Sequence, residues 1–343
     1  MFENRSPAFS PTVPLNSQDA FPAVYSTLSS EALRTQVLPQ FGLGDVKGIY
    51  FWCRGLSDVY LVQGASEQYI LRVSHHHWRS RGEVYFELEF LEFLQRCGMS
   101  ISAPIPTHTN SLAVDLIAPE GKRYAALFKR APGDVLMGDL DLEHGRILGQ
   151  TLAHMHQASH EFRSTHYRPP LDAELLIRRS LASIEPFFGD HPEDWGYLKE
   201  TADAIEATMN SLVVQIPYSV VCWGDPHSGN VHFLNGQPTQ FDFDQCGYGP
   251  RAFDLAKFLQ VAMQAGLNKS NRDAFFEGYQ QVITLTDEEH AALQRLTQAA
   301  HLWSWFISIT HGMLHDYSRL TPRFFTKRLQ QLKRLDTKDW ALF

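Results

Sequence analysis

The hydrophobic pattern of the chain changes its period at Pro132 and Gly133, and this change constrains the fold more than any single motif does. Before it, strand-like runs are separated by turn residues, and one helical stretch lies between the third and the fourth run. The strand-like runs are IYFW, DVYLVQ, QYILRVS, SLAVDLI and RYAALFKR, and the helical stretch is RGEVYFELEFLEFLQRCG. We therefore predict a strand-rich first lobe over residues 29–130.

After this point most of the chain has helical periodicity, and short strands are expected only within residues 219–244. The expected helices cover about residues 141–160, 172–187, 193–214, 251–265, 271–283, 287–310 and 322–335. The second lobe, residues 131–343, is thus predicted to be mainly helical. The two lobes are expected to meet at FKRAPG, residues 128–133.

The first 28 residues carry several prolines among Ser and Asn, which predicts a loosely ordered lead-in. A short helix is expected to follow Ser29 and Ser30 and to end before Pro39. The start of the chain lacks the pattern of a signal peptide. The apolar run SLVVQIPYSVVCW is too short and too interrupted to span a bilayer. We therefore expect a cytoplasmic protein with no membrane partner.

Length and charge narrow the class of protein further. With 343 residues, the chain is long enough for two lobes. Its formal net charge of −8 does not favour a nucleic-acid partner, which would require clustered Lys and Arg. The four cysteines form no CxxC pair, which argues against a zinc site or a disulfide framework and fits a reducing cytosol.

A glutamate on the expected helix of the first lobe requires a positively charged partner. Glu87 lies inside the apolar stripe of that helix, where a carboxylate needs a partner or a raised pKa. Arg72 in QYILRVS is the nearest candidate, although an arginine in solvent is the alternative when that residue is taken alone. A strand cation held by a helix carboxylate is the arrangement with which protein kinases hold nucleotide phosphates.

Two acidic segments of the second lobe predict a cation site. In WGDPHSGN, Asp225 and Asn230 are five residues apart, the same step as in the kinase catalytic loop. In that kinase loop, a carboxylate lies near the hydroxyl that attacks the phosphate, and a neutral amide oxygen can ligate magnesium. In FDFDQ, Asp242 lies between two phenylalanines and Asp244 follows the second, where a carboxylate is costly unless a positive charge meets it. We expect these two acids on one strand, with Asp242 as a metal ligand and Asp244 within reach of a second metal or of a loop backbone.

These segments together resemble the aminoglycoside phosphotransferase and choline kinase superfamily. Within it, the sequence as a whole is most similar to the stress-response kinase and type II homoserine kinase branches. The matching segments are YILRV, FELEFLEFL, LGQTLAHMH, WGDPHSGN, FDFD and FDLAKF, and they follow the family's order from about residue 50 to residue 265. The resemblance implies a two-lobed α+β fold like that of protein kinases, with a small antiparallel sheet and a larger helical lobe. It also implies transfer of the γ-phosphate of ATP, with Mg²⁺, to a hydroxyl group.

The resemblance also implies roles for individual residues. Asp225 is expected to be the catalytic base, and the metal ligands are expected to be Asn230, Asp242 and Asp244. The residues expected to contact the nucleotide are Arg72, Glu87, Gly55, Ser57, Phe128 and Arg130.

Three features depart from the family pattern. Trp223 stands where a histidine is usual, so its packing role must be met differently. Arg72 replaces the commoner lysine and presents a planar fork instead of a point charge. The turn in CRGLSDVYLV has one glycine, Gly55, and Asp58 beside it would repel phosphates unless it points away.

Several other residues have a structural interpretation that we prefer to a functional one. We expect His75, His76 and His77 to form a solvated turn, and His156 to be a core histidine with a backbone partner. The aromatic residues Trp303, Trp305 and Phe306 are expected in a helix core, with an aromatic lining for a substrate amine as the alternative. Asp254 opens a helix and is interpreted as its cap and as a brace for the catalytic loop.

The phosphate acceptor is left open by the sequence. Aminoglycosides, homoserine, amino alcohols and protein Ser or Thr are all compatible, and the net charge of −8 favours a cationic small alcohol. The acids at Asp139 or Asp141 and near Thr286 are explained as helix caps. Two alternatives remain: a nucleotide-binding pseudokinase, and a metallophosphoesterase in which GDPH and HGMLH would supply metal ligands.

Overall fold

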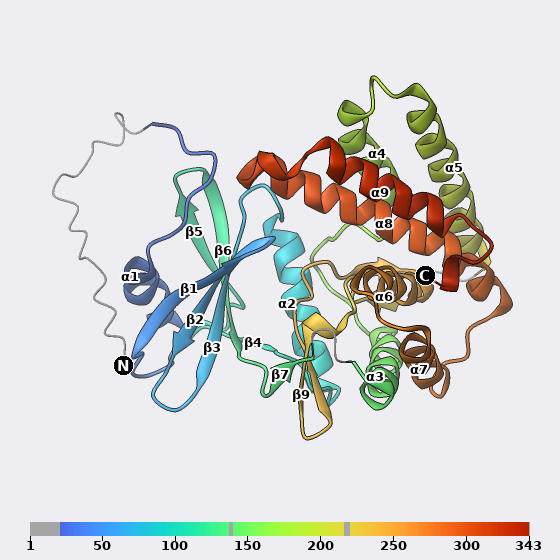
Figure 1. Cartoon of the computed structure of the whole chain (residues 1–343). Coiled ribbons are helices and arrows are strands. Elements are labelled where there is room, and N and C mark those ends of the chain that lie inside the picture. The colour runs from blue at the N-terminus through green and yellow to red at the C-terminus, as the bar shows by residue number, and fades with distance from the viewer. Residues whose placement is uncertain (1–20, 137–139, 216–219, 343) are drawn as a thin grey trace, which may run out of the picture.

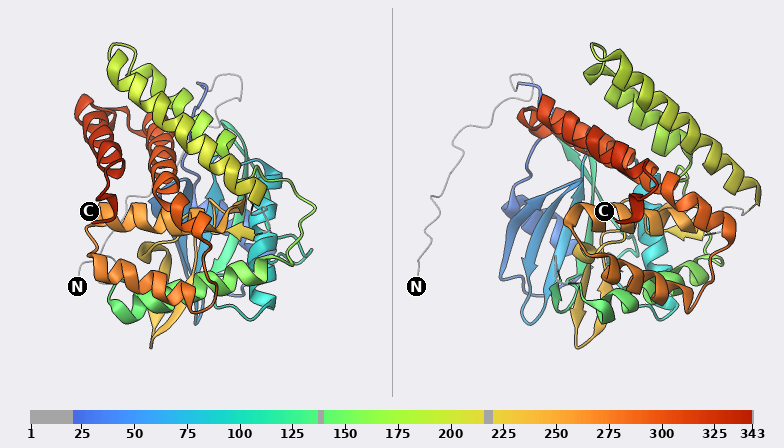
Figure 2. Two further views of the ribbon diagram at one scale, coloured as in Figure 1. Left: turned by 90° about the vertical axis from the view of Figure 1, so that its right-hand side faces the viewer. Right: turned by 45° about the vertical axis from the view of Figure 1, so that its right-hand side comes forward.

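The computed structural model describes residues 21–136, 140–215 and 220–342, and it contains two lobes of different composition. Figure 1 shows a twisted sheet on one side and a larger body of helices on the other. Figures 1 and 2 show the two long helices nearest the C-terminus, residues 287–315 and 322–335, side by side in the helical lobe. The predicted change from strands to helices near residue 130 is confirmed.

The first lobe is built on a six-stranded antiparallel sheet whose main path runs β1-β2-β3-β6-β4, with β5 paired to β6. Helix α2, Arg81–Arg96, follows β3 and begins with a capping box between Ser80 and Glu83. The strands are β1 Gly48–Arg54, β2 Ser57–Gln63, β3 Gln68–Ser74, β4 Pro104–Ile105, β5 Val114–Ala118 and β6 Gly121–Lys129.

Alternation along β3 sends its side chains into two different cores. Leu71 and Val73 pack with the segment Leu33–Phe41 on one face of the sheet. Ile70 and Arg72 point to the opposite face, where α2 lies. The core on the α2 side continues into the second lobe through residues such as Phe243 and Leu152, so the two lobes share one hydrophobic core.

The second lobe consists of helices around two small antiparallel strand groups. Helix α8 is the longest, and it packs against α4, α5, α6 and α9. The helices are α3 Leu142–Ser159, α4 Arg179–Ile184, α5 Pro192–Gln215, α6 Arg251–Ala265, α7 Lys269–Gln280, α8 Asp287–His315 and α9 Pro322–Leu335. The strands are β7 Asp134–Val135, β8 Val220–Cys222, β9 Val231–Leu234, β10 Gln237–Gln240 and β11 Gly247–Gly249. Within the described part of the chain, no helix combines the length and the apolar character that a membrane span requires.

The connection between the lobes passes from β6 to β7, and we propose the lobe boundary there. Gly133 has a φ of 82°, and a Cβ atom at this position would lie 2.2 Å from the carbonyl oxygen of Phe233. A glycine is therefore required where the connection crosses β9.

Three local expectations need correction. The short helix does not end before Pro39, because the chain continues from α1, Ser30–Ala32, through a π turn and a 3₁₀ turn to Phe41. The segment 25–28, expected to be loose, is hydrogen bonded to the first lobe. The acids of FDFD are not on a strand, because β10 ends at Gln240 and Asp242 adopts a left-handed φ of 59°.

The cap assignments can be compared in the same way. Asp141 caps α3, and Thr286 forms a capping box with Glu289 at the start of α8, as predicted. Asp139 lies outside the described residues. Asp254 is not a cap, because Pro250 occupies the N-cap position of α6 and Asp254 lies in the first turn.

Candidate active site

Arg72 and Glu87 form the ion pair that the sequence predicts. The guanidinium of Arg72 donates two hydrogen bonds to the Glu87 carboxylate, at 2.8 and 2.7 Å. The Glu87 side chain is 1% exposed, and the Arg72 side chain is 14% exposed. The guanidinium also lies over the ring of Phe128, 5.0 Å from its centroid. This planar fork gives Arg72 a fixed direction, which a lysine would lack.

The backbone of the loop that carries Asp225 is held by the side chain of Asp254 on α6. One oxygen of the Asp254 carboxylate accepts the backbone N–H of Trp223 at 2.7 Å, and the other accepts that of Gly224 at 2.8 Å. Gly224 has a φ of 84°, and a Cβ atom there would lie 2.1 Å from the Gln245 carbonyl oxygen. The brace predicted for Asp254 is thereby confirmed.

His156 contacts the same carboxylate. Its Nε2 lies 3.0 Å from Asp254, and its Nδ1 lies 2.8 Å from the hydroxyl of Tyr279. His156 is fully buried, as expected, but its partners are side chains and not the backbone.

Trp223 takes over the packing role that the sequence left open. It is fully buried and stacks on Phe243, with 5.1 Å between the ring centroids. Its indole N–H donates to the backbone carbonyl of Asp242 at 3.0 Å. The indole therefore ties the Asp225 loop to the left-handed backbone of Asp242.

Asp225 lies at the end of this loop with both carboxylate oxygens engaged. Oδ1 lies 3.3 Å from Nζ of Lys257, and Oδ2 accepts a hydrogen bond from Gln245 at 2.8 Å. Burial raises the pKa of Asp225, but the charge of Lys257 and the contact with His227 outweigh it and hold the pKa below its usual value. Asp225 is therefore ionised over the whole neutral range.

Asn230 is buried beside Asp225, with its amide oriented by the loop itself. Its Nδ2 donates to the backbone carbonyl of Asp225 at 3.1 Å. Because that bond uses the amide nitrogen, the amide oxygen of Asn230 faces elsewhere and remains an acceptor.

Among Asp225, Asp242 and Asp244, the carboxylate of Asp242 has the weakest contacts with other side chains. Its side chain is 54% exposed, and Oδ1 lies 4.0 Å from the guanidinium of Arg72 across the lobe junction. Loss of hydration and the nearby carboxylates of Asp244 and Asp225 outweigh Arg72 and raise the pKa of Asp242 to about 6, although more than half of the side chain still meets solvent. Its φ of 59° is a conformation that only a few residue types, Asp and Asn among them, adopt readily.

Asp244 has different contacts. Its carboxylate accepts the indole N–H of Trp78 and lies 3.6 Å from Nε of Arg79. Its backbone carbonyl accepts hydrogen bonds from Arg79 and Arg168. Burial raises its pKa, but the neighbouring arginines lower it overall. A cation at Asp244 would have to share a carboxylate that these partners already hold.

The turn between β1 and β2 carries two of the expected nucleotide contacts. The backbone N–H of Gly55 donates to the carbonyl of Ser57 at 3.0 Å, and the space around Gly55 is open. Ser57 is 6% exposed, so its side chain is turned inward. Arg130 follows β6 and its backbone N–H donates to Gln68 at 3.2 Å.

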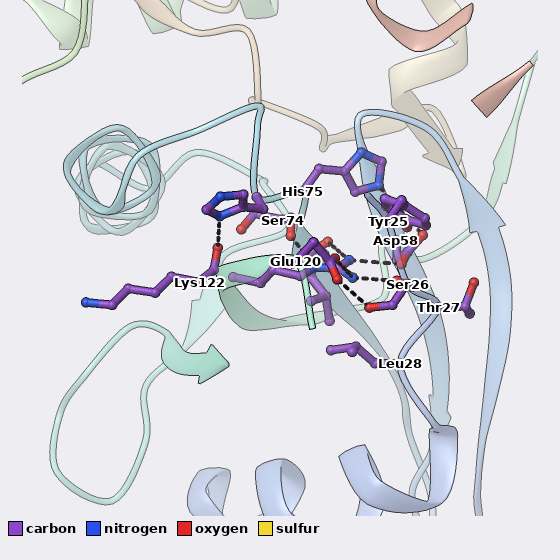
Figure 3. Close-up of polar contacts among 12 residues, drawn as sticks. Tyr25, Ser26, Thr27, Leu28, Asp58, Ser74, His75, Glu120 and Lys122 are labelled. Carbon is purple, nitrogen blue, oxygen red and sulfur yellow. Dashed lines mark hydrogen bonds and ion pairs between the residues drawn. The ribbon is translucent and has the colours of Figure 1, made fainter. Parts of the chain in front are cut away.

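Asp58 is buried in a polar cluster, part of which Figure 3 shows. Its carboxylate is fully buried and lies 3.0 Å from Arg54, 2.9 Å from Arg123 and 3.7 Å from His75. Burial raises the pKa of Asp58, but the hydrogen bonds in the cluster lower it well below its usual value. The carboxylate of Asp58 is thus buried and paired, and it is not a free negative charge beside the turn.

The segment 25–28 belongs to the same cluster. The ring of Tyr25 lies 4.0 Å from the Arg54 guanidinium, and its hydroxyl lies 3.2 Å from Nε2 of His75. The carbonyl of Ser26 accepts a hydrogen bond from Arg123 at 2.8 Å. His315 at the end of α8 contacts the ring of Tyr25, so the second lobe also reaches this cluster.

The histidine run is only partly a solvated turn. His76 and His77 are exposed, but His75 is 5% exposed because it packs into the Asp58 cluster. Trp303 and Trp305 are buried in α8, as predicted, whereas Phe306 is only half-buried and stacks on Trp303.

Sequence reasoning missed Lys257 and Gln245, the two partners of Asp225. The available signal was a lysine inside the mainly apolar helical run LAKFLQVA.

Comparisons with known proteins show the family and the fold of the chain. The model of a family described as the phosphotransferase enzyme family matches residues 54–297. An uncharacterised protein from Synechocystis is 48% identical, over 95% of this chain and 90% of that protein. Among solved structures, a microcompartment-associated aminopropanol kinase has a TM-score of 0.73 at 17% identity, over 91% of this chain and 99% of that chain.

An amicoumacin kinase, solved in complex with AMP-PNP, Ca²⁺ and Ami, has a TM-score of 0.68 at 18% identity. The match covers 84% of this chain and 87% of that chain. At these identities, the two structures show a shared fold.

Proposed function

The chain belongs to the phosphotransferase enzyme family and has its two-lobed, kinase-like fold, and on this premise we propose that it transfers the γ-phosphate of Mg-ATP to a hydroxyl group of a small molecule. The observation that carries the proposal is the 4.0 Å approach of Arg72 to Asp242. It brings the ion pair of the first lobe to the acidic group of the second, so that phosphate-binding and acceptor-activating groups share one junction.

Asp225 is proposed to accept the proton of the acceptor hydroxyl, or to orient that hydroxyl for attack. Its low pKa makes it a weak base, which suits a reaction in which little proton transfer is needed before the phosphoryl group leaves. Its contacts with Lys257 and Gln245 fix the direction of the carboxylate.

The oxygen donors of Asn230 and Asp242 fit a magnesium ion. Both are hard ligands, and the amide of Asn230 is already turned by its bond to Asp225 so that its oxygen is available. Loss of hydration and the charges of Asp244 and Asp225 raise the pKa of Asp242, and a bound cation would offset both effects. Bound Mg²⁺ would neutralise charge on the phosphate oxygens. A ligand role for Asp244 stays a prediction that its bonds to Trp78 and Arg79 do not favour.

The nucleotide is proposed to lie between the β1–β2 turn and the connection that follows β6. Arg72, held by Glu87, would contact its phosphates. The open turn at Gly55 leaves room for close backbone approach, and Phe128 and Arg130 would lie near the base. Ser57 would contribute through its backbone, because its side chain is buried.

The acceptor is proposed to be a small alcohol that carries an amine. The net charge of −8 would favour and steer a cation. Two structural neighbours, the aminopropanol kinase and the amicoumacin kinase, support a small-molecule acceptor over a protein Ser or Thr. A preferred acceptor without a positive charge would contradict this part of the proposal.

The experiment is a panel of acceptors with ATP and Mg²⁺, read by coupled release of ADP. Amino alcohols, homoserine, aminoglycosides, a neutral sugar and a Ser/Thr peptide would be compared. Asp225→Asn is the control: kcat should fall about 10²- to 10⁴-fold, with Mg-ATP affinity nearly unchanged. Wild-type turnover in this variant would exclude Asp225 from the mechanism.

Two outcomes would favour the alternatives. Binding of Mg-ATP without transfer to any acceptor would indicate a pseudokinase. Hydrolysis of phosphate esters without ATP would indicate a phosphoesterase. Against that second alternative, the HGMLH segment forms the end of α8, where His311 packs against His315 and His315 contacts Tyr25.

A further inference from the structure

The two carboxylate oxygens of Asp225 are held by side chains from two other parts of the second lobe, helix α6 and the turn before β11. Lys257 on α6 lies 3.3 Å from Oδ1. Gln245, between Asp244 and β11, donates to Oδ2 at 2.8 Å, and Nε2 of His227 lies 3.6 Å from the same oxygen. The direction of this carboxylate is thus set by contacts outside its own loop as well as by His227 within it.

The orientation of the Gln245 amide is fixed in turn by Trp303 of α8. The indole N–H of Trp303 lies 2.8 Å from Oε1 of Gln245. An indole N–H can only donate, so the atom that faces it must be the amide oxygen, and the amide nitrogen must then face Asp225. Gln245 is 8% exposed and Trp303 is 2% exposed, so solvent does not compete for either bond.

Lys257 reaches Asp225 from the helix that also braces the loop backbone. It lies one turn after Asp254, whose carboxylate accepts the N–H groups of Trp223 and Gly224. Lys257 is 4% exposed, and its Nζ also donates to Gln260 at 3.2 Å. A buried ammonium group requires a compensating negative charge, and Asp225 supplies it. Helix α6 therefore holds both the backbone and the side chain of the Asp225 loop.

We propose that Gln245 and Lys257 are positioning residues for Asp225, and that Trp303 locks Gln245 in the orientation that this requires. The inference rests on the proposed function, because the direction of the carboxylate matters for turnover only if Asp225 receives the acceptor hydroxyl. Displacement of a reacting group by about 1 Å can cost about 10²-fold in rate, so a small rotation of this carboxylate is sufficient for a large effect.

Gln245→Glu separates positioning from simple packing. The variant keeps an acceptor for the Trp303 indole and nearly the same volume, but it places a second carboxylate against Oδ2 of Asp225. We expect kcat to fall about 10- to 100-fold, with KM for Mg-ATP unchanged. If Gln245 only anchored Trp303, kcat would be retained. The indole N–H resonance of Trp303, assigned with Trp303→Phe, should still report a hydrogen bond in Gln245→Glu and lose it in Gln245→Met.

Lys257→Met and Lys257→Arg form the second comparison. Lys257→Met should lower kcat by a similar factor, and Lys257→Arg should recover much of the loss because it keeps the charge. Lys269→Met is the matched control, since the described contacts of Lys269 are with Asp273 on its own helix and not with Asp225 or its partners, and the variant should leave kcat unchanged. Wild-type kcat in Gln245→Glu or Lys257→Met, or a rise in KM for Mg-ATP alone, would overturn the proposal.

A thermal unfolding cycle tests the contact without any acceptor. The loss of unfolding midpoint caused by Lys257→Met should shrink when Asp225 is already Asn, because the variant then leaves no buried carboxylate unpaired. Equal losses in the two backgrounds would show that Lys257 does not act on Asp225. If wild type phosphorylates no acceptor but this coupling is found, the proposed function fails and the contact stands.

Discussion

Asp58 in the first lobe and Asp242 in the second are two acids near the same junction, and the fold treats them in opposite ways. Asp58 is fully buried and surrounded by Arg54, Arg123 and His75. Asp242 is 54% exposed, has a left-handed backbone, and approaches Arg72 only to 4.0 Å. The pKa of Asp58 lies below its usual value, whereas that of Asp242 is raised to about 6.

The difference separates a structural carboxylate from one available to a ligand. A carboxylate whose partners are already in place stabilises the fold and has no capacity for a further cation. A carboxylate that lacks such partners, and that is held in a left-handed backbone conformation by its neighbours, is typical of a functional site. The Trp223 indole, which donates to the Asp242 carbonyl, is part of what holds that backbone.

The largest expected effect is the loss of stability when the buried carboxylate of Asp58 is removed. Asp58→Asn removes the negative charge between Arg54 and Arg123, and the loss of one partner from a buried ion pair typically costs about 3–5 kcal/mol. Urea unfolding would measure this loss. Asp242→Asn serves as the matched control and should change stability little, because Asn also tolerates a positive φ. Equal losses in the two variants would contradict the distinction.

The next effect is the loss of Mg-ATP affinity when the carboxylate of Asp242 is removed. Asp242→Asn keeps the backbone conformation but removes the charge, so the affinity for Mg-ATP should fall by about tenfold or more. Calorimetric titration with Mg-ATP measures the change, and Asp225→Asn is the comparison that should bind almost as wild type does. If the two variants bound Mg-ATP equally well, the roles of Asp225 and Asp242 would be wrongly assigned.

The pH dependence of stability should differ in sign between the two acids. For Asp58 the folded-state pKa is lowered, so its contribution is complete above about pH 5 and is lost as the pH falls below about 4. For Asp242 the folded-state pKa is raised to about 6, so the unliganded protein binds more protons than the unfolded chain and loses stability as the pH rises from about 4 to 6.

This second effect is the smaller one, because the Asp242 side chain is 54% exposed. Melting temperatures of wild type, Asp58→Asn and Asp242→Asn across pH 3–8 would measure both slopes. Slopes of the same sign for the two acids would contradict the assignment.

The smallest expected effect is on stability, and it concerns the hydroxyl of Tyr25 in the Asp58 cluster. Tyr25→Phe removes the hydroxyl that lies 3.2 Å from His75 but keeps the ring over Arg54. We expect a loss of about 0.5–1.5 kcal/mol in the free energy of unfolding. A loss as large as that of Asp58→Asn would mean that the hydroxyl, and not the ion pairs, holds the segment 25–28 in place.

Much of the fold followed from local periodicity. The helices of the second lobe lie close to their expected ranges because an apolar stripe at helical spacing is a local property. The same holds for Arg72 and Glu87, since strand alternation and helix spacing each place one of them on the buried face. The strand predicted for FDFD failed because a positive φ at Asp242 interrupts the alternation, and the sequence does not signal that φ.

The two-lobed architecture and the order of the motifs could be predicted from the amino-acid sequence, and so could the candidate residues Arg72, Glu87, Asp225, Asn230 and Asp242. The surroundings of these residues follow from the packing of distant segments. Gln245 and Trp303 are 58 residues apart, and Asp58 and Arg123 are 65 apart, yet each pair is in hydrogen-bond contact. Such contacts depend on how whole helices and strands pack against one another. Periodicity shows which face of an element is buried, but it does not show which element covers that face.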